Sequence, residues 1–249
     1  MLILSLDTTT RAGSVAVVRD DEVLALQLGE SSRTHGERLP GEIDAALVAA
    51  SVDRKALDLL VVASGPGAFT GLRIGLAAIQ GLAMTLAKPV IGVSALDALA
   101  HTAFAAPRMP SAATIEHVAA LMDAQRGEVY AALYEKTKPG FVFSPELPWR
   151  MVQAPIVGPA AQVISGWTMD RSGAIRWVGD GAVRFGTIIE AAGTNWSVDM
   201  DVPPLAPALA HIGRLRAAQG EAGSPHALQP LYVRRPDAEL ERARRTHVV

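Results

Sequence analysis

The sequence predicts an α/β protein built from two related lobes, each with a mixed sheet. Three observations support this fold class. Short apolar runs alternate with segments of helical periodicity through residues 1–106. The layout of that half then recurs in the second half. Hydrophobic residues make up 49% of the 249 residues and charged residues 19%, which is ample material for packed cores.

The first half shows a regular order of elements. Apolar runs at 2–6, 14–18 and 22–28 are separated by polar turns and predict three strands joined as hairpins. Apolar residues at helical spacing then predict a helix over 38–50, followed by a strand over 57–63, a helix over 70–87, a strand over 89–92 and a helix over 95–106. Strands joined through helices are parallel and hairpin strands antiparallel, so we expect a ribonuclease-H-like lobe.

The second half repeats parts of the first. VAALMDAQRGEVYAALY at 118–134 matches ILSLDTTTRAGSVAVV, with a strand ending at Asp123 as the first ends at Asp7. The strand and turn at 175–182 echo those at 60–68. An internal duplication explains both matches, and chance similarity between common strand-turn patterns is the alternative. The prolines around 107–110 predict a linker, dividing an N-terminal lobe (1–106) from a smaller, degenerate C-terminal lobe (107–249), and 136–159 should be loop-rich.

Composition excludes several classes of protein. A net charge of −2 gives no basic excess for a stand-alone nucleic-acid binder, and the lack of cysteine excludes disulfides and thiolate metal sites. The N-terminus lacks a signal-peptide pattern, so we expect a cytoplasmic protein. The most apolar stretch, 74–87, is too short to span a membrane and predicts a buried helix, so no membrane partner is expected.

Two acid-containing loops are candidate nucleotide or phosphate sites. A hydroxyl-rich turn after a strand can direct amides and hydroxyls at a phosphate while its acid orients a cation. The alternative is that such an acid satisfies its own turn. The candidate residues of the two lobes are Asp7, Thr8, Thr9, Thr10, Asp123, Gly179, Asp180 and Gly181.

The helix predicted over 70–87 follows the turn SGPGAFTG. Its free amides favour an anion, although a tight turn that lets helix and sheet pack closely is the preferred interpretation. Gly71 and Gly75 lie four residues apart, as do Ala77 and Gly81, and such rows let another helix approach, within the chain or from a partner. Arg73 would contact an acidic partner or cap a loop.

Catalytic motifs are missing from the sequence. The six histidines include no HxxxH or HExxH pair, and there is no GxSxG elbow, so neither a histidine metal site nor a serine nucleophile is predicted. The arginine-rich tail at 233–245 would contact RNA or a partner, or remain solvated.

Four blocks together resemble a known family. ILSLDTTTRAGSVAVV, SGPGAFTGLRIGLAAIQGLAMTLAKPVIGVSALDALA, LMDAQRGEVYAALY and PLYVRRPDAE are similar, in order and spacing, to the bacterial TsaB (YeaZ) family. The resemblance implies an actin-like ATPase fold of two lobes with the second reduced. It also implies a role in making N6-threonylcarbamoyladenosine at position 37 of tRNAs that read codons beginning with A.

In that pathway a separate synthase makes threonylcarbamoyl-AMP, and the paralogous TsaD transfers the group with help from the TsaE ATPase. The resemblance implies a non-catalytic, dimerising subunit that binds TsaD, reaches tRNA through the complex and forms a homodimer when alone. It implies no tightly bound cofactor, with ATP or ADP possible at the complex interface or in the degenerate cleft.

The resemblance places the partner surface on the helices predicted over 38–50 and 70–87. The residues assigned to it are Leu39, Ile43, Leu47, Phe69, Thr70, Gly71, Arg73, Gly75, Ala78 and Leu82. The rival function is a small-molecule ATP-dependent phosphotransferase of the same superfold that uses Asp7 and Asp123 around Mg-ATP. A peptidase is opposed by the missing nucleophile and metal ligands.

Overall fold

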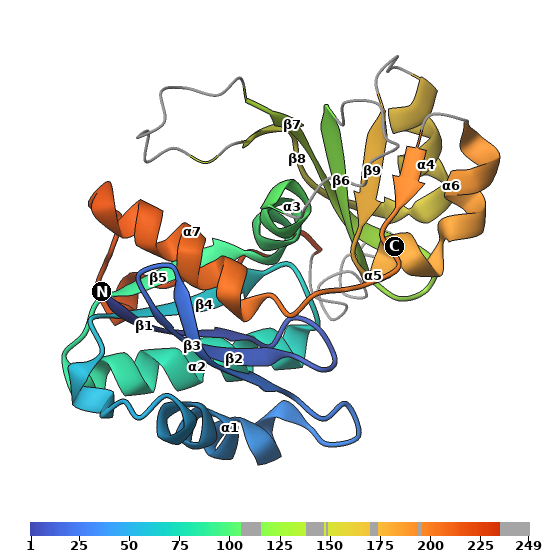
Figure 1. Cartoon of the computed structure of the whole chain (residues 1–249). Helices are drawn as coiled ribbons and strands as arrows, with labels where there is room; N and C mark the ends of the chain where they lie inside the picture. The colour runs from blue at the N-terminus through green and yellow to red at the C-terminus, as the bar shows by residue number, and fades with distance from the viewer. Residues whose placement is uncertain (106–115, 138–146, 148, 170–173, 194–195, 235–249) are drawn as a thin grey trace, which may run out of the picture.

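The computed structural model describes residues 1–105, 116–137, 147, 149–169, 174–193 and 196–234. The described residues form two five-stranded mixed sheets, each flanked by helices (Figure 1). The first sheet contains β1 (Leu2–Asp7), β2 (Ser14–Arg19), β3 (Glu22–Leu28), β4 (Leu59–Gly65) and β5 (Val90–Ser94). The second contains β6 (His117–Asp123), β7 (Glu128–Lys136), β8 (Trp149–Pro159), β9 (Ile175–Val178) and β10 (Trp196–Val198).

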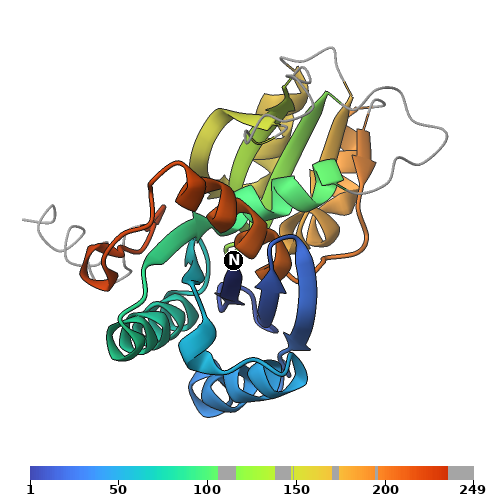
Figure 2. The ribbon, with the colours of Figure 1, turned by 60° about the vertical axis from the view of Figure 1, so that its left-hand side comes forward.

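Helices lie on both faces of each sheet. The helices are α1 (His35–Ala49), α2 (Phe69–Leu86), α3 (Ala95–Ala105), α4 (Ala160–Met169), α5 (Asp180–Arg184), α6 (Gly186–Ala192) and α7 (Ala206–Ala218), with short 3-10 turns at Arg54–Ala56 and Pro225–Ala227. Figure 2 shows α1 and α2 together on the outer face of the first sheet. Between the two sheets lie α3 and α7, and the outer face of the second sheet is covered by α4, α5 and α6.

The two sheets have the same topology, which confirms the predicted duplication. The strand order is β3-β2-β1-β4-β5 in the first sheet and, read in the corresponding direction, β8-β7-β6-β9-β10 in the second. In each sheet the first three strands pair antiparallel and the last two join in parallel. Asp7 and Asp123 therefore end equivalent strands, as the sequence predicts.

The alternating pattern of the strands explains the layers. In β1, Leu4 and Leu6 pack in the core beneath α1 and α2, whereas Ile3 belongs to the core between the sheets. Each is fully buried, and burying one such side chain contributes about 1.5–3 kcal/mol. The core between the sheets contains residues of both lobes, α3 and α7, so the two lobes are joined through it.

The structure differs from the expectations at three places. The division at residue 106 placed everything after it in the second lobe, but α7 packs on β1, β2, β4 and β5 of the first sheet. The segment 136–159, expected to be loop-rich, contains the long strand β8, because edge strands tolerate prolines. Helix α1 begins at His35 rather than at residue 38, because Thr34 and Glu37 form a capping box at its N-terminus. The predicted linker at 107–110 lies outside the described residues.

Helix α2 is long and apolar enough to cross a membrane by length and composition, and a third of it is buried within the chain. It packs along β4 and β5, so its inner face belongs to the core of the first lobe. The sequence prediction of a buried helix holds for that face only.

Candidate functional site

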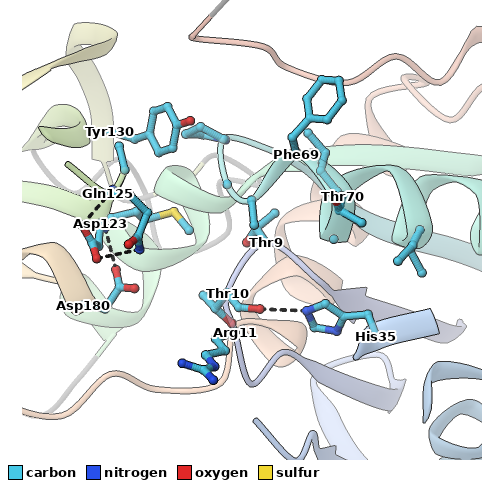
Figure 3. Close-up of a pocket in the computed structure, with 18 of the residues that line it drawn as sticks. Thr9, Thr10, Arg11, His35, Phe69, Thr70, Asp123, Gln125, Tyr130 and Asp180 are labelled. Carbon is cyan, nitrogen blue, oxygen red and sulfur yellow. Dashed lines mark hydrogen bonds between the residues drawn. The ribbon is translucent and has the colours of Figure 1, made fainter. Parts of the chain in front are cut away.

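A cleft of about 940 Å³ opens between the two lobes. Its walls come from the β1–β2 loop and residues 31–35, the Gly-rich turn with the first turns of α2, the β6–β7 turn, and residues 231–234 near the described end of the chain. In Figure 3, Thr9, Thr10 and His35 lie on the side of the first lobe, facing Asp123, Gln125 and Asp180 of the second.

On the first-lobe side, Asp7 is turned into the protein. The residue is 2% exposed, and its carboxylate accepts hydrogen bonds from the Thr9 amide at 2.7 Å, the Thr9 hydroxyl at 2.5 Å and the Thr10 hydroxyl at 3.0 Å. Thr9 and Thr10 line the cleft, whereas Asp7 and Thr8 do not. Asp7 therefore holds its own turn, which was the alternative considered from the sequence.

On the second-lobe side, Asp123 and Asp180 both line the cleft. The Asp123 carboxylate accepts hydrogen bonds from the Gln125 backbone amide at 3.0 Å and from the Gln125 side-chain amide at 2.9 Å. The same carboxylate forms an ion pair with Arg184. Asp180 accepts from the Asp123 amide at 3.0 Å. Burial, and to a smaller extent the Asp123 charge, raises the pKa of Asp180. The flanking Gly179 and Gly181 pack against the backbone of β6 instead of lining the cleft.

The Gly-rich turn is needed for close packing. A Cβ on Gly67 would stand 2.5 Å from Cβ of Thr9, and one on Gly65, where φ is +117°, would stand 2.7 Å from the Leu231 carbonyl oxygen. The Ala68 amide also donates to the Thr9 carbonyl at 3.3 Å. These contacts agree with the preferred interpretation, in which the turn brings helix and sheet loops together.

Two basic side chains in the first turn of α1 organise the first-lobe lip of the cleft. The His35 Nε2 lies 3.0 Å from the Thr10 carbonyl, and the Arg38 guanidinium lies 2.9 Å from His35 Nδ1. Arg38 is buried and forms an ion pair with Glu42 at 2.5 Å. Burial lowers the pKa of His35, with the nearby Arg38 charge acting in the same direction. Arg38 is not among the residues predicted from the sequence, although its i,i+4 spacing to Glu42 indicates this ion pair.

The arrangement fits a Mg-ATP centre poorly. Of the two acids proposed to flank the nucleotide, Asp7 faces its own turn and Asp123 is paired with Arg184. Among the described residues, no group of three His, Asp or Glu side chains is arranged to hold a metal ion. Asp7 and Asp123 are thus both engaged by other groups of the chain.

The structure places the predicted partner residues on different faces. Leu39, Leu47, Gly71 and Gly75 point into the first-lobe core, and Ile43, Ala78 and Leu82 are partly buried against it. A Cβ on Gly75 would collide with the Thr8 hydroxyl, and one on Gly71 with the Thr8 carbonyl. Assigning these two glycines to a subunit contact was wrong, because they let α2 approach the β1–β2 loop. Phe69, Thr70 and Arg73 are exposed.

A second row of small residues faces outward instead. On α1 the exposed row is Gly41, Ala45 and Val48, and on α2 it is Ala77, Gly81 and Met84. Val48 is 79% exposed and Met84 57%, and a Cβ on Gly41 or Gly81 would meet nothing within 4 Å. We call these six residues the outer helix face. The spacing of Ala77 and Gly81 was visible in the sequence, but its direction was not.

The segment 228–234, which we call the strap, returns from the first lobe to the second. The Leu231 amide donates to the Ser64 carbonyl at 2.7 Å, and the Tyr232 ring stacks on Phe69 with centroids 5.3 Å apart. Arg234 then binds the Ala124 carbonyl at 2.8 Å and pairs with Glu128 of the second lobe. Only the first part of the arginine-rich tail lies within the described residues, and that part is packed.

The duplicated sheets and the cleft between them define a protein of the two-lobed, actin-like ATPase class, with a cleft whose acids are engaged within the chain. The TsaB protein of Haemophilus influenzae, named for tRNA threonylcarbamoyladenosine biosynthesis, is 30% identical over 235 residues, which are 94% of each chain. The Escherichia coli TsaB is 34% identical over 175 residues, 67% of this chain and 72% of its own. The chain belongs to the TsaB (YeaZ) family.

Solved structures agree with this assignment. YeaZ from Pseudomonas aeruginosa is 29% identical and superposes with a TM-score of 0.75, covering 93% of this chain and 99% of its own. A family model described as TsaD, tRNA N6-adenosine threonylcarbamoyltransferase, matches residues 29–140. This range contains α1, α2 and the start of the second lobe. The family is involved in tRNA threonylcarbamoyladenosine biosynthesis.

Proposed function

We propose that this chain is the non-catalytic subunit that binds and supports TsaD in the complex modifying adenosine 37 of tRNAs that read codons beginning with A. The outer helix face is the observation that carries the proposal. Two adjacent helices expose apolar side chains around glycines that leave room for a neighbouring helix. A free surface of this kind is typical of a subunit contact.

The match to the TsaD model supports TsaD as the occupant of that face. The matched residues include both α1 and α2, so a TsaD subunit carries counterparts of these helices. Two such helix pairs can pack against one another about a pseudo-twofold axis, and two copies of this chain can do the same. The proposal therefore includes a homodimer when TsaD is absent, in competition with the TsaD complex.

The remaining parts of the proposal follow from the pathway. TsaE and tRNA act on the complex rather than on this chain alone, and the complex works in the cytoplasm. The chain has no tightly bound cofactor of its own, and ATP or ADP would bind at the complex interface or in the cleft. The engaged carboxylates of Asp7 and Asp123 favour the supporting role over a phosphotransferase.

Two glycines provide a matched test of the surface. Gly81 on α2 and Gly166 on α4 are both exposed, and a Cβ on either meets nothing within 4 Å. We expect Gly81→Leu to lose co-purification with the cognate TsaD and to sediment as a monomer, because its side chain fills the space for the partner helix. Gly166→Leu should keep both associations. Unchanged TsaD binding by Gly81→Leu would reject the outer helix face.

Reconstitution tests the role itself. The chain is mixed with its cognate TsaD, TsaE, synthase, tRNA, threonine, bicarbonate and ATP, and the modified adenosine is measured by mass spectrometry. We expect modification to require the chain and to be lost with Gly81→Leu. Equal modification without the chain would reject the supporting role, and turnover of ATP on a small acceptor by the chain alone would favour the phosphotransferase.

A further inference from the structure

The strap connects the two lobes beside the cleft. Within the strap, Leu228 is buried in the first-lobe core, and its carbonyl accepts from the Gln80 side chain at 3.4 Å. The Tyr232 hydroxyl accepts from Arg73 Nε at 3.0 Å, and the Arg73 guanidinium lies 3.8 Å from the centre of the Phe69 ring. This end of the strap is therefore bound to α2.

The other end of the strap is bound to the second lobe. Arg234 donates to the Ala124 carbonyl, pairs with Glu128 and lies 5.6 Å from the centre of the Tyr130 ring. Only one residue separates Tyr232 from Arg234, so the chain passes directly from one lip of the cleft to the other. Residues 231–234 line the cleft together with the loops of both lobes.

We infer that the strap is a clasp that closes one side of the inter-lobe cleft and holds the lobes at a fixed angle. The buried core around α3 and α7 also joins the lobes and acts as the hinge. The contacts of Arg234 are few and partly exposed, its side chain being 21% exposed and that of Glu128 36%, so they can open without unfolding either lobe. Opening the clasp would uncover the Phe69 end of α2 and widen the cleft.

The absence of cysteine from the sequence makes this inference directly measurable. Lys55→Cys in the first lobe and Gln162→Cys on α4 replace exposed side chains and accept a pair of spin labels. Distances between the labels are measured by pulsed electron resonance on the full chain. Excess unlabelled chain is added so that only labels within one molecule are read.

With the native strap we expect one narrow distance distribution. Arg234→Ala should broaden it and shift it, and Tyr232→Ala should do the same because it frees the other end of the strap. The matched control is Arg33→Ala, which removes a cleft-lining arginine of the first lobe and should leave the distribution narrow. Retained melting temperatures would show that the variants remain folded.

An unchanged distribution in folded Arg234→Ala and Tyr232→Ala would overturn the clasp. Equal broadening by Arg33→Ala would overturn it too, because the lobe angle would then depend on the charge of the cleft instead of the strap. The inference does not rest on the proposed function, since the measurement uses the isolated chain.

Discussion

The Tyr134 hydroxyl donates a 2.8 Å hydrogen bond to the Asp97 carboxylate, and this buried contact joins β7 of the second lobe to α3. Arg216 from α7, which packs on the first sheet, donates to the other carboxylate oxygen at 2.9 Å. One carboxylate thus connects elements of both lobes within their shared core. Burial raises the pKa of Asp97, while the hydrogen bond from Tyr134 and the charge of Arg216 oppose that change.

Removing either partner of this contact should destabilise the protein. We expect Asp97→Ala to cost about 3–5 kcal/mol, because it leaves a buried hydroxyl and a half-buried guanidinium without their acceptor. Tyr134→Phe should cost about 1.5–3 kcal/mol, the value of one hydrogen bond to a charged group. Urea unfolding followed by circular dichroism measures both. The control Asp44→Ala breaks the exposed pair with Arg54 and should cost at most about 1 kcal/mol; a similar loss there would mean that burial is not the cause.

Stability should fall in mild acid because of His101. Burial, with a smaller contribution from the stacked His211, lowers the pKa of His101 from 6.5 to about 4. Between pH 6.5 and pH 4, His101 is protonated in the unfolded chain but not in the folded chain. The free energy of unfolding is therefore highest above pH 6.5 and decreases as the pH falls toward 4. The loss amounts to about 3 kcal/mol.

Urea unfolding across this pH range tests the assignment. His101→Gln should flatten the curve relative to the native chain, whereas His226→Gln, which changes an exposed histidine, should leave it unaltered. If both variants keep the native slope, the acid sensitivity comes from another group.

The two kinds of glycine on α2 should respond oppositely to substitution. We expect Gly75→Leu to destabilise the monomer by about 1–3 kcal/mol or more, because the new side chain collides with Thr8 and Leu6. Gly81→Ala should stabilise it by about 1 kcal/mol through helix propensity alone. Thermal unfolding at low protein concentration separates these effects from association. Equal effects of the two substitutions would contradict the orientation of α2.

Asp7 should matter for stability and not for chemistry. Asp7→Asn keeps one acceptor oxygen but loses the charge that the Thr9 and Thr10 groups bind, so we expect a cost of about 1–3 kcal/mol. Below the melting transition, the reconstituted complex should modify tRNA at the native rate. Asp123→Asn serves as the comparison in the second lobe. If the Asp7→Asn variant is folded but tRNA modification is abolished, Asp7 acts in the reaction and the structural role is contradicted.

Local sequence patterns were sufficient to predict the order of elements and the duplication. The apolar runs ending at Asp7 and Asp123 predicted equivalent strands, and both sheets have them in the same topological position. Strand and helix periodicities are properties of a few neighbouring residues, which is why a single sequence reveals them. The family was predicted from the same blocks, and TsaB proteins that are 30% and 34% identical to this chain confirm it.

Only the tertiary structure decided which surface is free. Gly71 with Gly75 and Ala77 with Gly81 have the same spacing, yet the first pair packs on Thr8 and the second faces outward. Local sequence patterns likewise did not predict the return of α7 to the first sheet, the inward orientation of Asp7 or the path of the strap. Periodicity determines which residues share one face of a helix, whereas the side on which that face lies depends on contacts with residues distant in the chain. The sequence therefore determined the lobes and their helices, and packing against the sheet determined which helix face remained exposed.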